Sequence, residues 1–347
     1  MRGGLTLKQC NVIMTIVVLG VFFLSCGLSW ADEFDQFIMP MSNPVYTVGG
    51  ALNKTFIRPV YIYQHLPSRV DTVIDRSLGI EDLPLGGHVR GGALQAGISI
   101  NRRLSILAVK SGYINIRPDN TLSDSDGWVD LAAGVQYSFF YSPETKTVIS
   151  GRLIYEFANG SDQVYQGNGD GNIAPSLLFL KGIGRLELAG AMGFTIPLNA
   201  PEEDYVFFDS WHASYEIFSW FHPLIEINHF YTIKAGSRSG YIRQEVEDEG
   251  LGTTVAKSLS SPQEDDLVAS IATFNGCDII NLGGENSSVH RNFATMALGV
   301  RFPITRWLTV GYAYEFNLTP EENGLLADRH YGDVVITIPF SLEKFFK

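Results

Sequence analysis

His212, Ser214 and Asn228 are the residues of this chain whose types and spacing come nearest to a catalytic arrangement. His212 and Ser214 are two positions apart, so in an extended strand their side chains share one face. With Asn228 on the next strand, they could serve as base, nucleophile and orienting group in the cleavage of an ester. The alternative is a polar lining of an interior. We favour it because a group that cleaves membrane lipid would have to face the opposite way.

Six charged residues interrupt otherwise apolar, alternating stretches and are predicted to face the same interior. They are Arg152, Glu156, Glu216, Glu226, Arg301 and Glu315. We expect Arg301 to pair with Glu315 across a hairpin, and Glu216 and Glu226 to project from neighbouring strands as a close carboxylate pair. Charges inside a barrel either line a water-filled path, where they set ion preference, or bridge one another and partly plug it. The sequence leaves both readings open.

Two connecting segments are rich in carboxylates and amides, which are the oxygen ligands that Ca²⁺ prefers. The first segment holds Asp119, Asp124, Asp126 and Asp130, and the second holds Asp162, Asn168, Asp170 and Asn172. Neither has the spacing of a calcium-binding loop with its distal glutamate. Because Asn-Gly and Asp-Gly are common turn formers, we favour a turn role for both segments. We predict no metal site, no cofactor and no catalytic residues.

The elements that must position these side chains are extended strands, because polar and apolar residues alternate along most of the chain. In the stretch 293–316, apolar side chains occupy one face, and Arg301 and Glu315 belong to the other, small and polar face. Twelve such stretches are predicted, at 55–63, 93–100, 104–114, 128–140, 147–157, 172–180, 185–196, 207–217, 224–231, 293–302, 308–316 and 331–340. Their lengths centre on ~10 residues, which a tilted strand needs to cross a membrane. Because Pro339 donates no hydrogen bond, we expect the last strand either to end or to bulge near Ile338.

The connections between these stretches alternate between short and long. The long ones lie at 64–92, 115–127, 158–171, 197–206, 232–292 and 317–330. This order is typical of outer-membrane barrels, which have short periplasmic turns and long extracellular loops. We therefore predict an all-β fold, an antiparallel up-and-down transmembrane β-barrel of about 12 strands.

The first 53 residues are predicted to lie outside the barrel. Residues 1–31 have the basic start, short apolar core and small residues before a cleavage site that are typical of a signal peptide; a lipoprotein site at Cys26 is the alternative. Residues 32–53 then form an N-terminal periplasmic segment, and 54–347 form the barrel. Cys277 is the one cysteine beyond the signal peptide, so no intrachain disulfide is expected.

The connection at 232–292 is too long for a simple hairpin tip. It contains an acidic run at 245–249 and an apolar piece at 267–274, LVASIATF, that would be poorly placed in water. We expect this extracellular loop to fold back over the barrel mouth as a lid. The alternative is an added hairpin that raises the strand count to fourteen.

The composition bounds the compartment and the partners. The chain carries 25 Lys and Arg against 37 Asp and Glu, a net charge of −12, which argues against a nucleic-acid partner. No stretch after residue 31 offers the run of about 20 apolar residues that a membrane helix needs. An exported chain of this kind can enter a membrane as a closed barrel, since every backbone group must be paired there. We therefore expect the cell outer membrane, with its lipid, the barrel-assembly machinery and a small-molecule solute as partners.

Five short segments carry motifs of a known family. They are Met41-Ser42-Asn43-Pro44, 108–114, 126–134, 166–171 and 281–284. In these segments the chain resembles the outer-membrane barrel family named for the MetA pathway of phenol degradation. The resemblance covers most of the chain after the signal peptide. It implies a transporter-like barrel that moves small or aromatic compounds.

Three functions follow from these observations, in order of preference. The first is a porin-like channel for the passive passage or binding of small molecules, hydrophobic or aromatic ones among them, and not an enzyme. The second is a structural or surface-exposed barrel without transport. The third is an enzyme, since His212, Ser214 and Asn228 resemble the catalytic set of outer-membrane phospholipase A.

Overall fold

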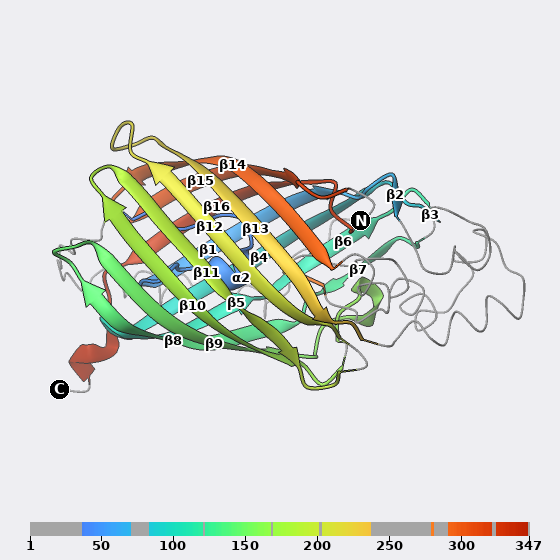
Figure 1. Ribbon diagram of the computed structural model, residues 1–347, viewed down its shortest axis with the longest axis horizontal. Helices are drawn as coiled ribbons and strands as arrows, with labels where there is room; N and C mark the ends of the chain where they lie inside the picture. The colour runs from blue at the N-terminus through green and yellow to red at the C-terminus, as the bar shows by residue number, and fades with distance from the viewer. Residues whose placement is uncertain are drawn as a thin grey trace, which may run out of the picture.

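The computed structural model describes residues 37–70, 83–120, 122–167, 169–200, 203–236, 279–280, 291–320 and 324–345. Within these ranges, twelve antiparallel strand positions close into one barrel, which confirms the predicted fold. Figure 1 shows the tilted strands wrapped around the segment that carries the short helix α2 (Pro44–Thr47). No helix in the described ranges is both long enough and apolar enough to cross a membrane.

Ten of these barrel positions hold a single strand. They are β1 (Thr55–His65), β4 (His88–Asn101), β9 (Thr147–Phe157), β10 (Asn172–Ile183), β11 (Leu186–Pro197), β12 (Tyr205–Tyr215), β13 (His222–Lys234), β14 (Asn292–Thr305), β15 (Leu308–Asn317) and β16 (Asp328–Ile338). The other two positions each hold two successive strands. These are β5 (Leu104–Lys110) with β6 (Gly112–Arg117), and β7 (Ser125–Trp128) with β8 (Leu131–Ser142). All twelve predicted stretches coincide with these positions.

Neighbouring strands pair as consecutive antiparallel hairpins, and β1 pairs with β16 to close the wall. β16 ends at Ile338, directly before Pro339, as expected for a residue without a backbone N–H. The short strands β2 (Arg69–Val70) and β3 (Leu83–Pro84) pair with each other outside the barrel sheet. Two single-turn helices, η1 (Asp162–Val164) and η5 (Leu342–Phe345), complete the described elements.

The short turns all lie at one end of the barrel, which we call the periplasmic end. Local side chains and left-handed residues close them. The Asn101 side chain accepts hydrogen bonds from the N–H groups of Arg103 and Leu104 at 2.8 and 3.0 Å. Lys146 (φ 46°) and Gly184 (φ 60°) take the left-handed conformation that tight hairpins need. The long connections lie at the opposite, extracellular end, so the predicted alternation is confirmed.

The outer face of the barrel is apolar. Large hydrophobic side chains that are more than a third exposed recur on successive strands, among them Leu94, Ile106, Leu153, Leu177, Ile225, Leu298 and Tyr312. A continuous apolar belt of this kind is stable against lipid and not against water. The alternating residues point inward and are buried, and many of them are polar or charged. The barrel therefore has the outer face of an outer-membrane protein, as predicted.

Candidate functional site

Residues 37–53, which we call the lumenal segment, lie inside the barrel. The prediction that 32–53 form a periplasmic segment is wrong for this part, and 32–36 lie outside the described residues. Residues 40–48 are all buried. Phe37 packs near Gly182 at the periplasmic end, α2 lies deeper in the barrel, and Asn53 leads back to β1 at the periplasmic end. The segment therefore enters and leaves through the same end of the barrel.

Arg152 holds the second half of the lumenal segment. Its guanidinium donates to the carbonyl oxygens of Tyr46, Val48 and Gly50 at 2.9, 2.7 and 3.0 Å. Gln136 accepts from Nε and Nη2 of the same side chain at 2.9 and 2.6 Å. Arg152 faces inward, as predicted, but it binds backbone carbonyls of the lumenal segment and lines no open path. A buried guanidinium is stable when its donors are satisfied in this way.

Glu226 holds the first half of the lumenal segment. Its carboxylate accepts hydrogen bonds from the N–H groups of Met41 and Ser42 at 2.8 and 2.6 Å, and from the Ser42 hydroxyl. His212 Nδ1 lies 2.7 Å from Glu226 Oε1 on the neighbouring strand. Charge-assisted hydrogen bonds to a carboxylate are among the stronger polar contacts in proteins. Glu226 therefore anchors the lumenal segment, which was predicted to lie in the periplasm and not inside the barrel.

Arg301 also binds the lumenal segment. Its Nε and Nη2 donate to the carbonyl oxygen of Met39 at 3.1 and 2.8 Å. Its Nη1 bonds Asp333, and Asp333 also bonds Arg58 Nε at 2.5 Å. Arg58 in turn donates to the carbonyl oxygen of Met41 at 3.1 Å. Two arginines bridged by one buried carboxylate thus hold the entry of the segment.

The expected pairing of Arg301 with Glu315 is wrong. The register places Arg301 opposite Gly311 and Glu315 opposite Ala297, which separates the two side chains along the hairpin. Glu315 instead accepts hydrogen bonds from the Tyr331 hydroxyl at 2.6 Å and from Asn228 Nδ2 at 2.9 Å. The hairpin register thus fixes which inward positions can meet.

The expected close pair of Glu216 and Glu226 does not form, although the structure describes both residues. Glu226 stands opposite His212 in the β12–β13 register, whereas Glu216 follows the end of β12 at the periplasmic end. Glu216 is half-buried and lines a cavity of about 340 Å³, together with Lys54, Arg301 and Arg306. We call this cavity the periplasmic vestibule. Of the six predicted interior charges, Glu216 and Arg301 line it, and Glu216 is the one that is partly exposed there.

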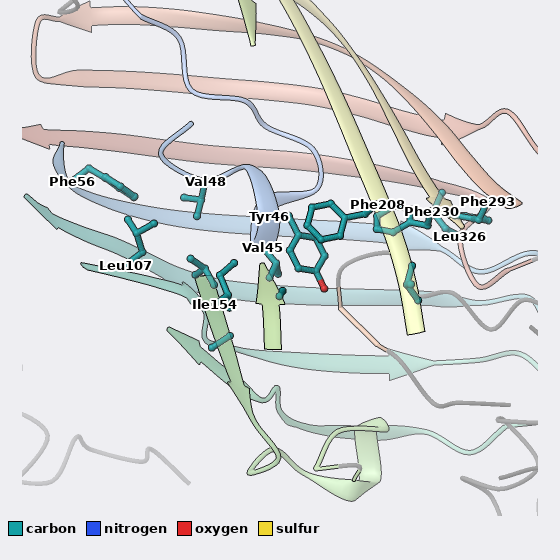
Figure 2. Close-up of a cluster of buried hydrophobic side chains, with 14 residues drawn as sticks. Val45, Tyr46, Val48, Phe56, Leu107, Ile154, Phe208, Phe230, Phe293 and Leu326 are labelled. Atoms are coloured by element: carbon teal, nitrogen blue, oxygen red, sulfur yellow. The ribbon is translucent and has the colours of Figure 1, made fainter. Parts of the chain in front are cut away.

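Aromatic and aliphatic side chains surround α2. The ring of Tyr46 stacks on Phe208 with the ring centres 4.0 Å apart and an angle of 17° between the planes. Figure 2 shows these two rings face to face, with Phe230 and Phe293 beyond Phe208. The Tyr46 hydroxyl lies 3.1 Å from the Thr195 hydroxyl. The lumenal segment is thus fixed by one stacked ring as well as by polar contacts.

The extracellular mouth contains a second apolar cluster and a buried ion pair. The cluster joins residues of several connections to the upper strands: Leu66, Val70, Leu85, Val89, Ile114, Ile116, Leu122, Val129, Val164, Tyr165, Ile280 and Leu325. Beneath it, Lys110 Nζ lies 2.7 Å from Glu156 Oε1 and 2.7 Å from the carbonyl oxygen of Ile279. Ile279 and Ile280 belong to the long connection at 232–292, so this part of the connection reaches the mouth. The 267–274 piece expected to form the lid lies outside the described residues.

In the two acidic connections carboxylates accept hydrogen bonds from nearby N–H and hydroxyl groups, and Asp124 and Asp126 of the first also lie within ion-pair distance of Arg117. Asp130 Oδ1 accepts from the N–H groups of Asn159 and Gly160 at 2.8 and 2.6 Å, and from Gly167 at 3.0 Å. Asp126 accepts a hydrogen bond from the Tyr113 hydroxyl, and Asp162 Oδ1 accepts one from the N–H of Gln163 at 2.8 Å. These contacts fit the turn role that we favoured over calcium binding.

Glu203 is buried in the mouth, in the connection before β12. Burial, helped by the nearby carboxylate of Glu156 and opposed by Lys110, raises the pKa of Glu203 to about 8. Its Oε2 has no hydrogen-bond partner among the described residues. A carboxyl group in this environment is protonated at neutral pH.

His212, Ser214 and Asn228 face inward, but they do not form a nucleophile–base–orienter set. His212 Nδ1 bonds Glu226, and the Ser214 hydroxyl oxygen has no partner within the part of the chain described. Asn228 Nδ2 bonds the Ser42 hydroxyl at 3.0 Å and Glu315 at 2.9 Å. Two of the three side chains therefore belong to the anchoring of the lumenal segment.

Comparison with known proteins finds similar structures but no similar sequences. No family model matches the chain, and no curated protein matches its sequence. The barrel is similar to the crystal structure of an outer membrane channel from Pseudomonas putida F1, with a TM-score of 0.55 at 12% identity, over 87% of this chain and 100% of that one. The fold is that of an outer-membrane channel.

Two porins give weaker matches to the barrel. The NanC porin has a TM-score of 0.44 at 7% identity, over 82% of this chain and 100% of that one. The KdgM porin has a TM-score of 0.40 at 8% identity, over 81% and 98%. The closed strand order and the likeness to the Pseudomonas putida channel identify the fold.

Sequence reasoning found the inward charges but missed their main partner, the lumenal segment. The sequence does contain an indication of this segment's location. Residues 37–53 have no charged side chain, which is unusual for the water-exposed periplasmic segment that was predicted. A solvated segment usually carries charge. The uncharged stretch and the surplus of inward-facing donors and acceptors could together have indicated that it packs inside the barrel.

Proposed function

We propose that this protein is an outer-membrane channel for small molecules and that the lumenal segment is its removable plug. The observation that carries the proposal is how the segment is held. Wall side chains bind its backbone, and it contributes no strand to the barrel sheet. Water can replace such hydrogen bonds, each of which contributes about 1.5–3 kcal/mol when one partner is charged. Because no strand pair of the described barrel includes the segment, its release leaves every one of those pairs intact.

The interior also supports a class of solute. The vestibule of about 340 Å³ at the periplasmic end falls within the range of small-molecule sites, roughly 300–1,000 Å³. Deeper in the barrel, removal of Tyr46 would uncover the face of Phe208, close to Phe230 and Phe293. Exposed aromatic faces bind flat apolar molecules by stacking. This favours small apolar or aromatic solutes, the class that the family resemblance implies.

In this proposal the inner polar residues are anchors. His212 and Asn228 act by holding Glu226 and Ser42, and we assign no catalysis to them. The tight contacts that seat the segment also mean that the channel is closed for most of the time.

Single-channel recording in planar bilayers tests the proposal. The full chain is expected to give rare and brief openings, and a variant that lacks residues 38–51 a large and steady conductance. Heat-modifiable migration in gels checks that both barrels are folded. A folded deletion variant without conductance would contradict the plug role.

A structural barrel without transport is the second candidate, and the filled interior favours it. Apolar residues close the mouth, and the lumenal segment fills the region below it. Swelling of liposomes in the presence of phenol-sized solutes distinguishes the two. A structural barrel gives no swelling for the full chain or for the deletion variant.

A further inference from the structure

A cluster of metal-ligating side chains lies on the outer face of the barrel, at the extracellular end of the β1–β16 seam. His65 is the last residue of β1, and it pairs in register with Asp328, the first residue of β16. His330 lies two residues further along β16, on the same face. All three side chains are partly exposed, and His65 alternates along β1 with Gln64, which is buried on the lumenal side. The cluster is therefore separate from the lumen.

The geometry of the cluster suits one ion. His65 Nδ1 lies 2.8 Å from Asp328 Oδ1, and His330 Nε2 lies 3.8 Å from the same oxygen. One ligand atom from each residue lies within 4.8 Å of the others. Ligands bound tetrahedrally at about 2.0–2.2 Å stand roughly 3.3 Å apart. Small rotations of half-exposed side chains bring the three atoms to that separation.

Neighbouring aromatic groups orient the two imidazoles. The Tyr312 hydroxyl lies 2.8 Å from His330 Nδ1. In the tautomer that donates Nδ1–H to this hydroxyl, Nε2 presents its lone pair toward Asp328 and His65. Metal-binding histidines commonly have their second nitrogen held in this way. The ring of Tyr63 packs edge-on against His65 with the ring centres 5.0 Å apart, which limits rotation of that imidazole.

The donor set selects the kind of ion. Two imidazoles and one carboxylate are ligands of Zn²⁺ and related divalent transition metals, whereas Ca²⁺ and Mg²⁺ take oxygen ligands. Three protein ligands on an exposed face leave a coordination position for water. We propose that His65, Asp328 and His330 form a binding site for a divalent transition-metal ion of the Zn²⁺ type, which links β1 to β16.

The location gives the site a consequence for the fold. Apart from the seam, each barrel position of the described residues pairs with the position before or after it along the chain, whereas the seam joins residues 263 positions apart. Pairing along the seam is interrupted between Ile57 and Val60, where Pro59 offers no N–H. An ion bound by His65 of β1 and by two residues of β16 cross-links the first and last strands at the extracellular end, in addition to their backbone hydrogen bonds. Binding to the folded form alone raises its stability by mass action.

Titration of the intact barrel with Zn²⁺ in detergent tests the site. The protein is used as a Cys277→Ser variant, without an affinity tag and after treatment with a chelator, which removes the Cys277 thiol, the tag histidines and any ion carried through purification. We expect calorimetry to give one bound ion per chain. We also expect Zn²⁺ to raise the unfolding temperature of the barrel, measured as the temperature at which the folded band is lost from the gel. His65→Gln and His330→Gln should each weaken binding about tenfold or more, and the double variant should lose the thermal shift.

Two further variants separate a built site from nonspecific binding. His229→Gln is the matched control, because His229 lies 3.0 Å from Asp209 in a similar cross-strand pair, with Asn292 at its other nitrogen. It should bind Zn²⁺ as the parent does. Tyr312→Phe should keep the ligands but weaken binding, because it removes the group that orients His330. Saturable binding that survives in the double variant, or no saturable binding by the folded parent, overturns the proposal.

Discussion

The replacement of Arg152 by methionine tests whether wall side chains seat the lumenal segment. The variant keeps a long side chain but removes the hydrogen bonds to the carbonyl oxygens of Tyr46, Val48 and Gly50. Each bond to a charged donor contributes about 1.5–3 kcal/mol. One guanidinium makes all three, so their contributions are not additive, and we take about 3 kcal/mol for the group. Since about 1.4 kcal/mol is a factor of ten, the ratio of released to seated segment should rise ~100-fold.

Hydrogen exchange of the folded barrel in detergent measures this ratio. Backbone amides of residues 37–53 should exchange ~100-fold faster in Arg152→Met, with the amides of the strands unchanged. Single-channel recordings should show a higher open probability in the same variant. Arg103→Met is the matched control, because Arg103 is exposed in the turn between β4 and β5 and should leave both readouts unchanged.

Two results would refute this reasoning. Unchanged exchange of residues 37–53 in a folded Arg152→Met barrel would show that the guanidinium does not hold the segment. Faster exchange of the strand amides to the same extent would show that the segment and the wall open as one unit. The lumenal segment would then be part of the core and no removable plug.

Three further predictions concern the connections. Epitope tags placed at Asp124 or Asp170 should be accessible to antibody on intact cells, and a tag at Glu144 should not; labelling at Glu144 would reverse the orientation. Glu203→Gln should remove a pH dependence of stability. The buried Glu203 carboxyl stays protonated up to a pKa of about 8, whereas in the unfolded chain it ionises above its ordinary value of 4.5. The contribution of protonated Glu203 to the free energy of unfolding is therefore fully present below pH 4.5. It falls by at most about 1.4 kcal/mol per pH unit as the pH rises to 8. Thermal unfolding at pH 5 and pH 8 should differ more in the parent than in Glu203→Gln, and equal differences would count against a protonated Glu203. Removal of residues 237–276 should leave a folded, heat-modifiable barrel with larger conductance, and loss of assembly would instead make that segment part of the wall.

The barrel wall could be predicted from the sequence because its determinants are local. In lipid every backbone group must pair, and consecutive strands do so as hairpins, so strand order follows chain order. The period of two then assigns each residue to lipid or to the interior, and a slip of one residue would reverse every face. In 293–316 this was enough to place Arg301 and Glu315 inside correctly. The turns followed from local chemistry as well, as at Asn101 and Gly184.

The partners of the inward residues could not be predicted in this way, because the closed barrel decides them. Arg301 meets Asp333 and the carbonyl oxygen of Met39, although these residues are far from it in the chain. Which side chains face one another across the lumen depends on barrel width and strand stagger, and neither is written in a local pattern. The same holds for His65 and Asp328, which meet because the first strand pairs with the last. The uncharged residues 37–53 fit inside because closure leaves donors and acceptors of the wall that need partners away from water.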